Sequence, residues 1–263
     1  MNVMNMNKAS VPEGLVLLAP REEDFDKAKA IADHLDIPLL TEIPEEGMTD
    51  LHLVYDEKGL SLADENLSMQ GDFTKMEKRL KRNNLQQEFL VKASKLKGVT
   101  GPMTAVDATA GLGEDSLLLA AAGYEVRLFE YDPVIAALLR DALERAREIP
   151  SLSEIAGRMI LCEGDSIAAL TNMDPSPDLI LLDPMFPARQ KSGLIKKKFQ
   201  LLQQLERPCS DEEDLLRAAI SAKPRRILIK RPLKGPFLAG MKPDYSLNGK
   251  AIRYDVMQFV REI

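Results

Sequence analysis

The feature that most constrains the fold of this chain is a regular alternation of apolar and amphipathic segments between Ala105 and Ile229. Short apolar segments predict buried strands, and the amphipathic segments between them predict helices. The expected strands are 105–106, 125–129, 159–162, 179–182 and 227–229, and the expected helices are 116–122, 133–147, 166–170 and 211–222. Because each helix returns the chain so that the next strand runs in the same direction, this order predicts an α/β fold with a doubly wound, mostly parallel sheet.

The helix that begins at Pro133 is the most clearly marked of these elements. Proline is well tolerated in a first helical turn, where its missing N–H has no helical partner. Five apolar side chains then fall on one stripe: Ile135, Leu138, Leu139, Ala142 and Ala146. We expect this stripe to pack on the sheet. One further strand is expected near 254–260.

The beginning of the chain has a less regular pattern and predicts a small α/β domain. It contains an apolar run at 15–18, a helical pattern at 22–35 and a strand pattern at 51–55. The expected divisions are a small domain over 1–70, a basic linker helix region over 71–100 and a larger domain over 101–263.

Composition is that of an ordinary globular protein, with 45% hydrophobic and 29% charged residues in a chain of 263. No apolar run approaches the ~20 residues of a membrane-spanning helix. The first ten residues lack the apolar core of a signal peptide, so we expect a cytoplasmic protein. With only two cysteines and two histidines, neither a disulfide framework nor a metal site is expected.

Positive charge is concentrated in three segments, although the net charge is -6. Residues 75–97 hold eight Lys/Arg against two Glu, residues 189–198 hold five against none, and residues 223–234 hold six against none. The net charge excludes a uniformly basic nucleic-acid binder, but a single basic surface that faces phosphates would produce this asymmetry. The alternative is three separate solvated surfaces.

A glycine-rich loop, Asp107–Asp115 (DATAGLGED), joins the first strand of the larger domain to its helix. Nucleotide-like ligands bind at this position in open α/β sheets. A dinucleotide loop would have a third glycine where Ser116 stands, and it would hold a pyrophosphate anion. The carboxylates here would repel that anion but attract the ammonium and sulfonium groups of S-adenosylmethionine, which is therefore the favoured cofactor. The candidate cofactor-binding residues are Asp107, Gly111, Gly113, Glu114 and Asp115.

Two further acidic residues follow the next two strands. Glu130 ends the second strand, where a carboxylate can accept hydrogen bonds from ribose hydroxyls of either cofactor class. Asp165 follows the third strand and is a candidate acceptor for an adenine amine. Asp165 is also suited to cap the helix that starts at Ser166, and one side chain can serve both purposes.

The candidate reacting centre is Asp183-Pro-Met-Phe-Pro187, which follows the fourth strand directly. The loop after this strand lies at the carboxyl edge of the sheet, beside the cofactor crevice. An exocyclic base amine is a poor nucleophile until acceptors draw its N–H groups, and Asp183 with the Pro184 carbonyl can be those acceptors. Phe186 offers a flat face for a base that has left its stack. Alone, the motif is more typical of a rigid turn with Phe186 in the core, and the catalytic interpretation depends on its combination with the 107–115 loop, Glu130 and Asp165.

Positive charges without any acid follow this motif. The candidate RNA-binding residues here are Arg189, Lys191, Lys196, Lys197 and Lys198. So close to a base pocket they can contact the phosphates that flank a target nucleotide. The alternative is a solvated, lysine-rich start of a helix.

Together, the 107–115 loop, the 183–187 motif with Lys191-Ser192 and its lysine pair, Pro133–Leu139 and Lys230-Arg231-Pro232 resemble one known family. This is the bacterial family of small-subunit ribosomal RNA guanine-N2 methyltransferases, and the resemblance covers most of residues 70–260. It implies a Rossmann-like class I methyltransferase fold, S-adenosylmethionine as methyl donor and one guanine near the 3′ end of 16S rRNA as substrate. The implied cofactor contacts are Glu114, Asp115, Glu130, Tyr131, Asp165, Ser166 and Asp183.

The resemblance also implies RNA contacts from a basic stretch before the cofactor strand. This chain has Arg79, Lys81 and Arg82 there, without the glycines of the family. The partner implied is 16S rRNA or the small ribosomal subunit. Other hypotheses are an adenine-N6 methyltransferase, which would use the same two acceptors, a non-catalytic RNA-binding assembly factor, and a dinucleotide oxidoreductase.

Overall fold

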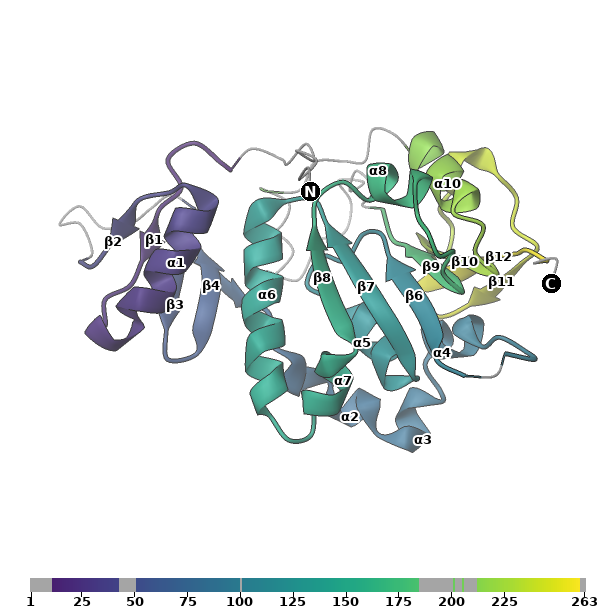
Figure 1. Cartoon of the computed structure of the whole chain (residues 1–263), viewed down its shortest axis with the longest axis horizontal. Helices are drawn as coiled ribbons and strands as arrows, with labels where there is room; N and C mark the ends of the chain where they lie inside the picture. Colours follow the sequence, from purple (N-terminus) through teal and green to yellow (C-terminus); the bar gives the residue numbers. More distant parts are fainter. Residues whose placement is uncertain are drawn as a thin grey trace.

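The computed structural model describes residues 11–42, 51–99, 101–184, 201, 205 and 212–260. These residues form two sheets, one of five and one of seven strands, and the long helix α6 (Pro133–Glu148) stands between them (Figure 1). Helices cover both faces of the larger sheet. The predicted α/β architecture is confirmed.

The larger sheet has the strand order β11-β12-β10-β9-β6-β7-β8. Its strands are β6 Met103–Asp107, β7 Tyr124–Glu130, β8 Met159–Glu163, β9 Leu179–Leu182, β10 Arg226–Pro232, β11 Tyr245–Asn248 and β12 Ile252–Gln258. Pairing is parallel from β8 across to β10, whereas β12 is antiparallel to both β10 and β11. The five strands expected at 105–229 are all present, and the one expected near 254–260 starts two residues earlier. The short strand β11 was not predicted.

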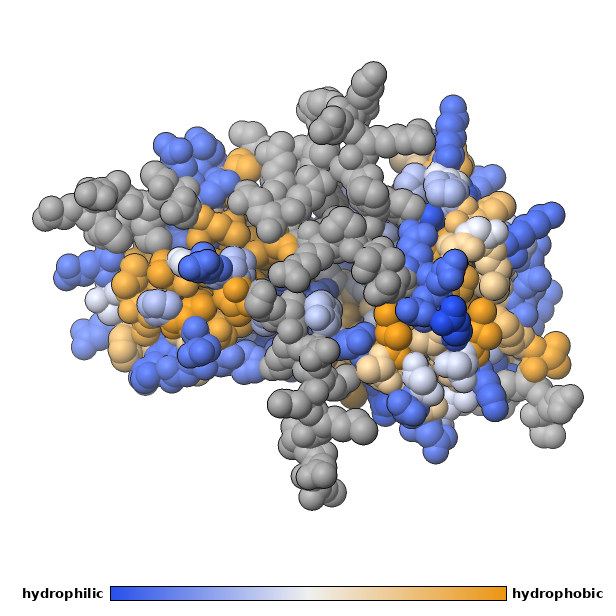
Figure 2. Space-filling view, turned by 90° about the horizontal axis from the view of Figure 1, so that it is seen from above, coloured by the Kyte–Doolittle hydropathy of each residue, from blue (hydrophilic) through white to orange (hydrophobic). Residues whose placement is uncertain are grey.

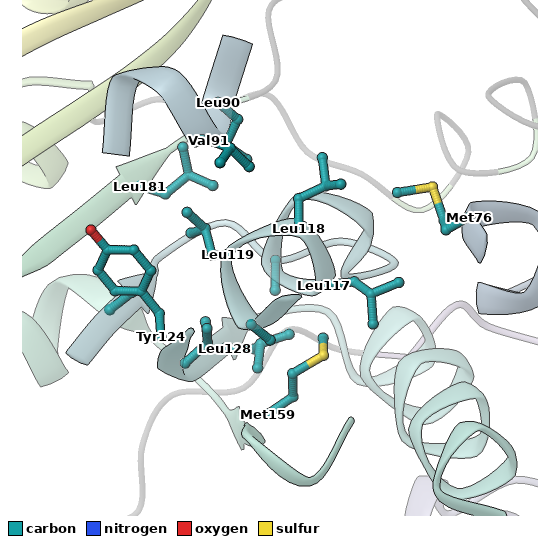
Figure 3. Packing of buried hydrophobic residues seen from close by; sticks show 14 of the residues in the cluster. Met76, Leu90, Val91, Leu117, Leu118, Leu119, Tyr124, Leu128, Met159 and Leu181 are labelled. Atoms are coloured by element: carbon teal, nitrogen blue, oxygen red, sulfur yellow. The ribbon is translucent and has the colours of Figure 1, made fainter. Parts of the chain in front are cut away.

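The two faces of this sheet are buried under different helices. On one face, side chains such as Leu181 and Leu128 pack with α4 (Phe89–Ser94) and α5 (Glu114–Ala121), as Figure 3 shows. On the other face, Ile180 and Leu182 pack with α8 (Ser166–Thr171) and α10 (Glu212–Ser221). Successive residues of a strand point to opposite faces, so a strand covered on both sides must be apolar throughout. All four residues of β9 are fully buried.

The smaller sheet has the order β2-β1-β3-β4-β5. Its strands are β1 Leu17–Leu18, β2 Leu39–Leu40, β3 His52–Asp56, β4 Gly59–Ala63 and β5 Ser68–Gln70, with α1 (Phe25–Leu35) packed beside them. The predicted strand at 51–55 and the predicted helix are present, and the apolar run at 15–18 contains β1. Strands β4 and β5 were missed because they are short and lack a run of β-branched residues.

The segment expected as a linker holds several short helices. They are η2 Phe73–Met76, α2 Glu77–Leu80, α3 Arg82–Leu85 and α4. Phe73, Met76, Leu90 and Val91 are buried in the same core as α5 and the larger sheet. Residues 73–94 therefore pack with the larger sheet.

Helix α6 is buried on two sides, so the prediction of a single stripe facing one sheet was wrong. Leu139, Ala142 and Ala146 lie in the core of the larger sheet. Ile135 and Leu138 instead lie in the core shared with the smaller sheet. The sequence pattern gave the apolar surface of the helix correctly, but it contains no information on how many partners divide that surface.

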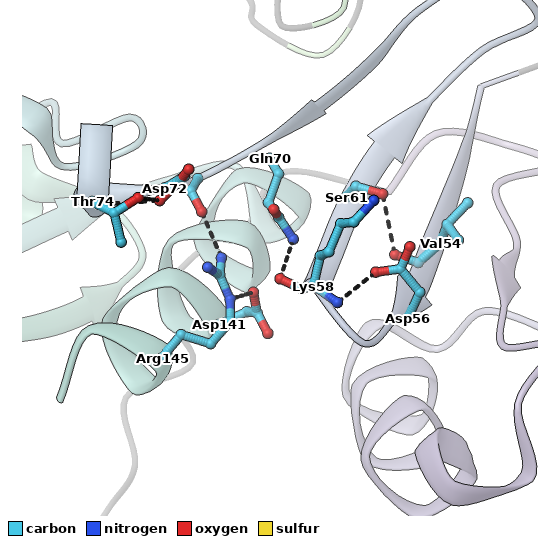
Figure 4. A network of polar contacts seen from close by, with 10 residues as sticks. Val54, Asp56, Lys58, Ser61, Gln70, Asp72, Thr74, Asp141 and Arg145 are labelled. Atoms are coloured by element: carbon cyan, nitrogen blue, oxygen red, sulfur yellow. Dashed lines mark hydrogen bonds and ion pairs between the residues drawn. The ribbon is translucent and has the colours of Figure 1, made fainter. Parts of the chain in front are cut away.

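A polar contact joins α6 to the segment that follows β5 (Figure 4). Arg145 Nε donates to Asp141 Oδ2 at 2.8 Å, and Arg145 Nη2 donates to the Gly71 carbonyl at 2.5 Å. Burial raises the pKa of Asp141, and Arg145 offsets part of that rise. Gly59 has a φ of +97°, and a Cβ there would lie 2.5 Å from Arg145 Nε and 2.6 Å from Asp141 Oδ2. Gly59 therefore lies against the Arg145–Asp141 pair of α6, and a larger residue there would displace these two side chains.

We predict that Gly59→Ala lowers the free energy of unfolding more than Gly14→Ala does. Gly14 also has a positive φ, +78°, but a Cβ there would meet no atom within 4 Å. Gly14→Ala should therefore cost only the left-handed backbone strain, about 1 kcal/mol, whereas Gly59→Ala adds about 1–3 kcal/mol of overpacking. Urea unfolding of both variants measures the difference. Equal losses would contradict this account of the α6 contact.

Candidate functional site

The candidate site lies at the carboxyl ends of the parallel strands, where the 107–115 loop leaves β6 and enters α5. Gly111 and Gly113 have φ values of +54° and +75°, which other residues adopt only with strain. A Cβ on Gly113 would lie 2.7 Å from Leu139 Cδ1, so this glycine lets the loop pack tightly on α6. A Cβ on Gly111 would meet no atom within 4 Å, so space is open above the backbone at that position.

Asp107 stabilises this loop from its buried side. Its side chain is buried, and Oδ2 accepts a hydrogen bond of 2.6 Å from the Ser116 hydroxyl. Oδ1 accepts from the backbone N–H of Thr109 at 3.1 Å. Burial raises the pKa of Asp107 to about 7, against the lowering effect of these two hydrogen bonds, and the nearby carboxylates of Asp115 and Asp183 raise it further. Its oxygens therefore face the protein and hold the loop in shape.

Glu130 connects the second strand to the same loop. Its Oε2 accepts from the backbone N–H of Gly111 at 2.8 Å, and its Oε1 accepts from that of Asp132 at 2.8 Å. The neighbouring Tyr131 is 45% exposed. Glu130 and Gly111 are thus in direct contact, and an exposed aromatic ring follows them.

Asp165 caps helix α8, as the sequence suggested. Its Oδ1 accepts from the backbone N–H of Ile167 at 2.8 Å, and Ser166 is partly exposed beside it. Glu163, at the end of β8, accepts from His34 Nε2 of α1 at 2.9 Å and also from Arg140. The N-terminal unit therefore reaches the same edge of the sheet.

Asp183 is joined to the cofactor loop by two contacts that the sequence did not reveal. Its backbone N–H donates to Thr109 Oγ1 at 2.7 Å. Its Oδ2 lies 2.7 Å from Lys230 Nζ, and the same ammonium lies 2.7 Å from Asp115 Oδ2. Lys230 on β10 thus bridges the first turn of α5 and the residue that follows β9. Thr109 and Lys230 were not predicted as site residues, although both lie in segments that carry the family resemblance, because their contacts with Asp183 depend on the packing of distant strands.

The charged groups of this cluster shift the pKa values of Asp183 and Lys230. Burial raises the pKa of Asp183, and the positive charge of Lys230 offsets part of that rise. Burial lowers the pKa of Lys230, but the carboxylates of Asp115 and Asp183 outweigh it and leave the pKa above its usual range. Burial also raises the pKa of Tyr254, which is the β12 partner of Lys230. Lys230 is therefore an ammonium across the whole neutral range.

The remaining predicted residues are distributed as follows. Glu114 starts α5, Pro184 is buried beside Asp183, and Lys81 and Arg82 are exposed. Arg79 forms a two-point pair with Glu88, with Nε 2.8 Å from Oε1 and Nη2 2.9 Å from Oε2. Phe186, Arg189, Lys191, Lys196, Lys197 and Lys198 lie outside the described residues.

Among the described residues, no three His, Cys, Asp or Glu side chains are grouped closely enough to hold a metal ion. No described helix combines the length and apolar character needed to cross a membrane.

A glycine loop after the central strand of this sheet, with acidic residues after the neighbouring strands, defines the class of Rossmann-like, S-adenosylmethionine-dependent methyltransferases. The family model for SAM-dependent methyltransferases matches residues 39–259. The crystal structure of a SAM-dependent methyltransferase from Neisseria gonorrhoeae superposes with a TM-score of 0.72 at 28% identity, covering 93% of this chain and 95% of that one.

This chain belongs to the family of ribosomal RNA small subunit methyltransferase J. The protein of that name from Thioalkalivibrio sulfidiphilus is 41% identical over 243 residues, which cover 89% of this chain and 94% of the relative. The one from Nitrosococcus oceani is 38% identical over 240 residues, with the same coverage of both chains. The dinucleotide alternative is thereby set aside, and the cofactor is S-adenosylmethionine.

The residues present fit this cofactor. The open space above Gly111 admits a ligand close to the backbone, and Glu130 touches the same residue. The loop carries carboxylates and no cation of its own, which suits a ligand with two positive groups and no phosphate.

We predict that Asp107→Asn changes the pH dependence of stability. Because the pKa of Asp107 is raised in the folded state, the stability that its neutral form contributes is present at acidic pH and is lost as pH rises through about 7. Asparagine stays neutral and keeps the same shape. The free energy of unfolding of the variant should therefore rise relative to wild type between about pH 4 and pH 7. Urea titrations at several pH values test this, and parallel curves would contradict it.

Proposed function

We propose that this protein transfers a methyl group from S-adenosylmethionine to the N2 exocyclic amine of a guanine in 16S rRNA. The observation that carries the proposal is the position of Asp183, an acceptor at the carboxyl end of β9 that is hydrogen-bonded to the cofactor loop. The name of the two relatives, ribosomal RNA small subunit methyltransferase J, supports a small-subunit ribosomal RNA as substrate. The resemblance noted in the sequence supports guanine N2, and such a substrate suits a cytoplasmic protein.

The reaction needs an amine that is made nucleophilic at the right place. When bound, S-adenosylmethionine supplies an electrophilic methyl group. Asp183 and the Pro184 carbonyl accept the amine N–H groups, so that the nitrogen lone pair is freed from the ring and points at the methyl carbon. The nitrogen would gain the methyl group and lose a proton, which Asp183 accepts and passes to solvent, and S-adenosylhomocysteine would be the second product. Phe186 is proposed to stack on the extruded base.

Lys230 is proposed to position Asp183 for this step. Its ammonium holds Oδ2 at 2.7 Å, which leaves Oδ1 to accept from the base amine. Its positive charge also lowers the pKa of Asp183, which offsets part of the rise that burial causes. Because the same ammonium holds Asp115, the acceptor for the amine and the first turn of the cofactor helix are fixed relative to each other.

The cofactor contacts proposed from the sequence fall into two groups. Gly111, Glu114, Asp115, Glu130 and Tyr131 are proposed to bind the amino-acid and ribose parts of the cofactor, with Asp165 and Ser166 at the adenine. Asp107 and Gly113 are proposed to act through the shape of the loop, since the first faces inward and the second packs on Leu139. The proposed RNA contacts remain Arg189, Lys191, Lys196, Lys197, Lys198, Lys81 and Arg82, with Arg79 available only if it leaves Glu88.

We predict transfer of tritium from labelled S-adenosylmethionine to 16S rRNA or to small ribosomal subunits, with N2-methylguanosine as the product. Nucleoside mass spectrometry separates this product from N6-methyladenosine, the product of the alternative activity. Asp183→Ala should lower kcat about 100- to 1000-fold, because one preorganised acceptor is lost. Calorimetry should show cofactor binding within a few-fold of wild type. Cofactor binding without transfer to any RNA would overturn the proposal and favour a non-catalytic assembly factor.

We also predict that Lys230→Met moves the acidic limb of the kcat profile to higher pH. Asp183 accepts the amine hydrogen bond only when ionised, and its pKa is raised by burial but lowered by Lys230. Removing the ammonium raises that pKa further, so activity falls at a higher pH as the solution is acidified. Lys230→Arg keeps the charge and should leave the limb near its wild-type position. A merely structural role would lower kcat equally at all pH values.

A further inference from the structure

The edge of the larger sheet that carries the site, at the carboxyl ends of the parallel strands, has two halves, one on each side of Asp183. The loops after β6, β7 and β8 carry the proposed cofactor contacts on one side of Asp183. On its other side lie the carboxyl end of β10 and the start of its antiparallel partner β12, where Pro232 pairs with Ile252. Lys230 stands only two residues before Pro232, so the surface beyond Pro232 begins next to the reacting centre.

One side of that surface is formed by the start of α4 and the turn between β11 and β12. Phe89 is 41% exposed, and a Cβ on Gly249 of this turn would lie 3.7 Å from its ring. Lys92, one helical turn on, has its Nζ 5.4 Å from the centre of the Phe89 ring. The ammonium therefore lies over one face of the partly exposed ring.

The other side is formed by the loop after β10. The Leu233 N–H donates to the Ala251 carbonyl at 3.0 Å, which joins this loop to the same turn. Phe237 is 37% exposed, and Arg253 Cζ lies 5.1 Å from the centre of its ring. Arg253 also donates to the carbonyls of Pro232, Leu233 and Gly235, at 2.9 to 3.0 Å. A buried arginine thus holds both the loop and its exposed ring in place.

The exposed lysines of this region are not paired with acids of the described chain, although Lys92 Nζ donates to Gln87 Oε1 at 3.1 Å. Lys92, Lys234 and Lys250 are exposed, and none forms an ion pair with another residue of the described chain. The neighbouring acids are engaged: Glu88 by Arg79, Glu212 by Arg231 and Asp255 by Arg253. Seen from above, this half of the molecule, at the right of Figure 2, shows hydrophilic side chains interleaved with hydrophobic ones.

We infer that these residues form a docking surface for single-stranded RNA. The aromatic-lysine surface consists of Phe89, Lys92, Lys234, Phe237, Lys250 and Ile252. Exposed rings that stack with bases, set among lysines that contact phosphates, match single-stranded nucleic acid in both shape and charge. The inference rests on the proposed function and extends it, because it assigns the nucleotides beside the target base to the β10–β12 half of the edge.

The test is fluorescence anisotropy with a labelled single-stranded RNA of about 12 nucleotides, titrated at several salt concentrations. The Lys234→Gln/Lys250→Gln variant should bind roughly tenfold more weakly, with a salt slope smaller by about 1.4, because two phosphate contacts are lost. Phe89→Ala and Phe237→Ala should each weaken binding about fivefold or more with an unchanged salt slope, because stacking is lost without loss of charge.

Matched controls lie on α1, away from this surface. Lys27→Gln/Lys29→Gln removes the same charge, and Phe25→Ala removes a ring that is 38% exposed. Both controls should bind RNA as wild type does, and all variants should bind S-adenosylmethionine normally by calorimetry. If wild type binds the RNA but the surface variants bind equally well, the inference is wrong.

Two further results would distinguish a failure of this inference from a failure of the proposed function. Loss of binding to small ribosomal subunits with normal binding to naked RNA would assign the surface to a ribosomal protein and overturn the inference. A wild-type protein that methylates no RNA would instead refute the proposed function, whatever the binding of the variants.

Discussion

The structure depends on a parallel sheet that is covered by helices on both faces. In such a sheet every residue of a central strand is removed from water, so polar side chains are excluded from the strand and accumulate at its ends. β9 shows this directly, because its four residues are fully buried and Asp183 is the first polar residue after them. The crossover connections bring all carboxyl ends to one edge, and the chemistry of the protein collects there.

At that edge the central electrostatic feature is one ammonium between two carboxylates. The carboxylates of Asp115 and Asp183 both raise the pKa of Asp107, and that of Asp115 also raises the pKa of Asp183, so like charges repel one another at this edge. The ammonium offsets this repulsion for Asp115 and Asp183. Asp107 does not contact the ammonium; its side chain is buried and accepts two hydrogen bonds from within the protein. The pair of contacts from Lys230 and the Thr109 hydroxyl makes the cofactor loop and the proposed acceptor a single rigid unit.

The N-terminal unit is part of this arrangement. Its core is completed by Ile135 and Leu138 of α6, and Gly59 fits against Arg145 on the same helix. His34 reaches Glu163 at the end of β8. A helix that is shared by two cores transmits the position of one sheet to the other, since close-packed interiors do not deform easily. The family model begins at residue 39, so strands β2 to β5 of this unit belong to the matched region.

The sequence by itself determined the strands of the larger sheet apart from β11, the helices α5, α6, α8 and α10, the glycine loop, the cap at Asp165 and the place of Asp183. Each of these is a local pattern: an apolar run, a turn residue or a position after a strand. The tertiary structure alone decided the rest. Lys230 contacts Asp115 across 115 positions of the chain, α6 serves two cores, and the oxygens of Asp107 turn inward. These features come from long-range packing and burial, which set pairings and pKa values that no local spacing contains.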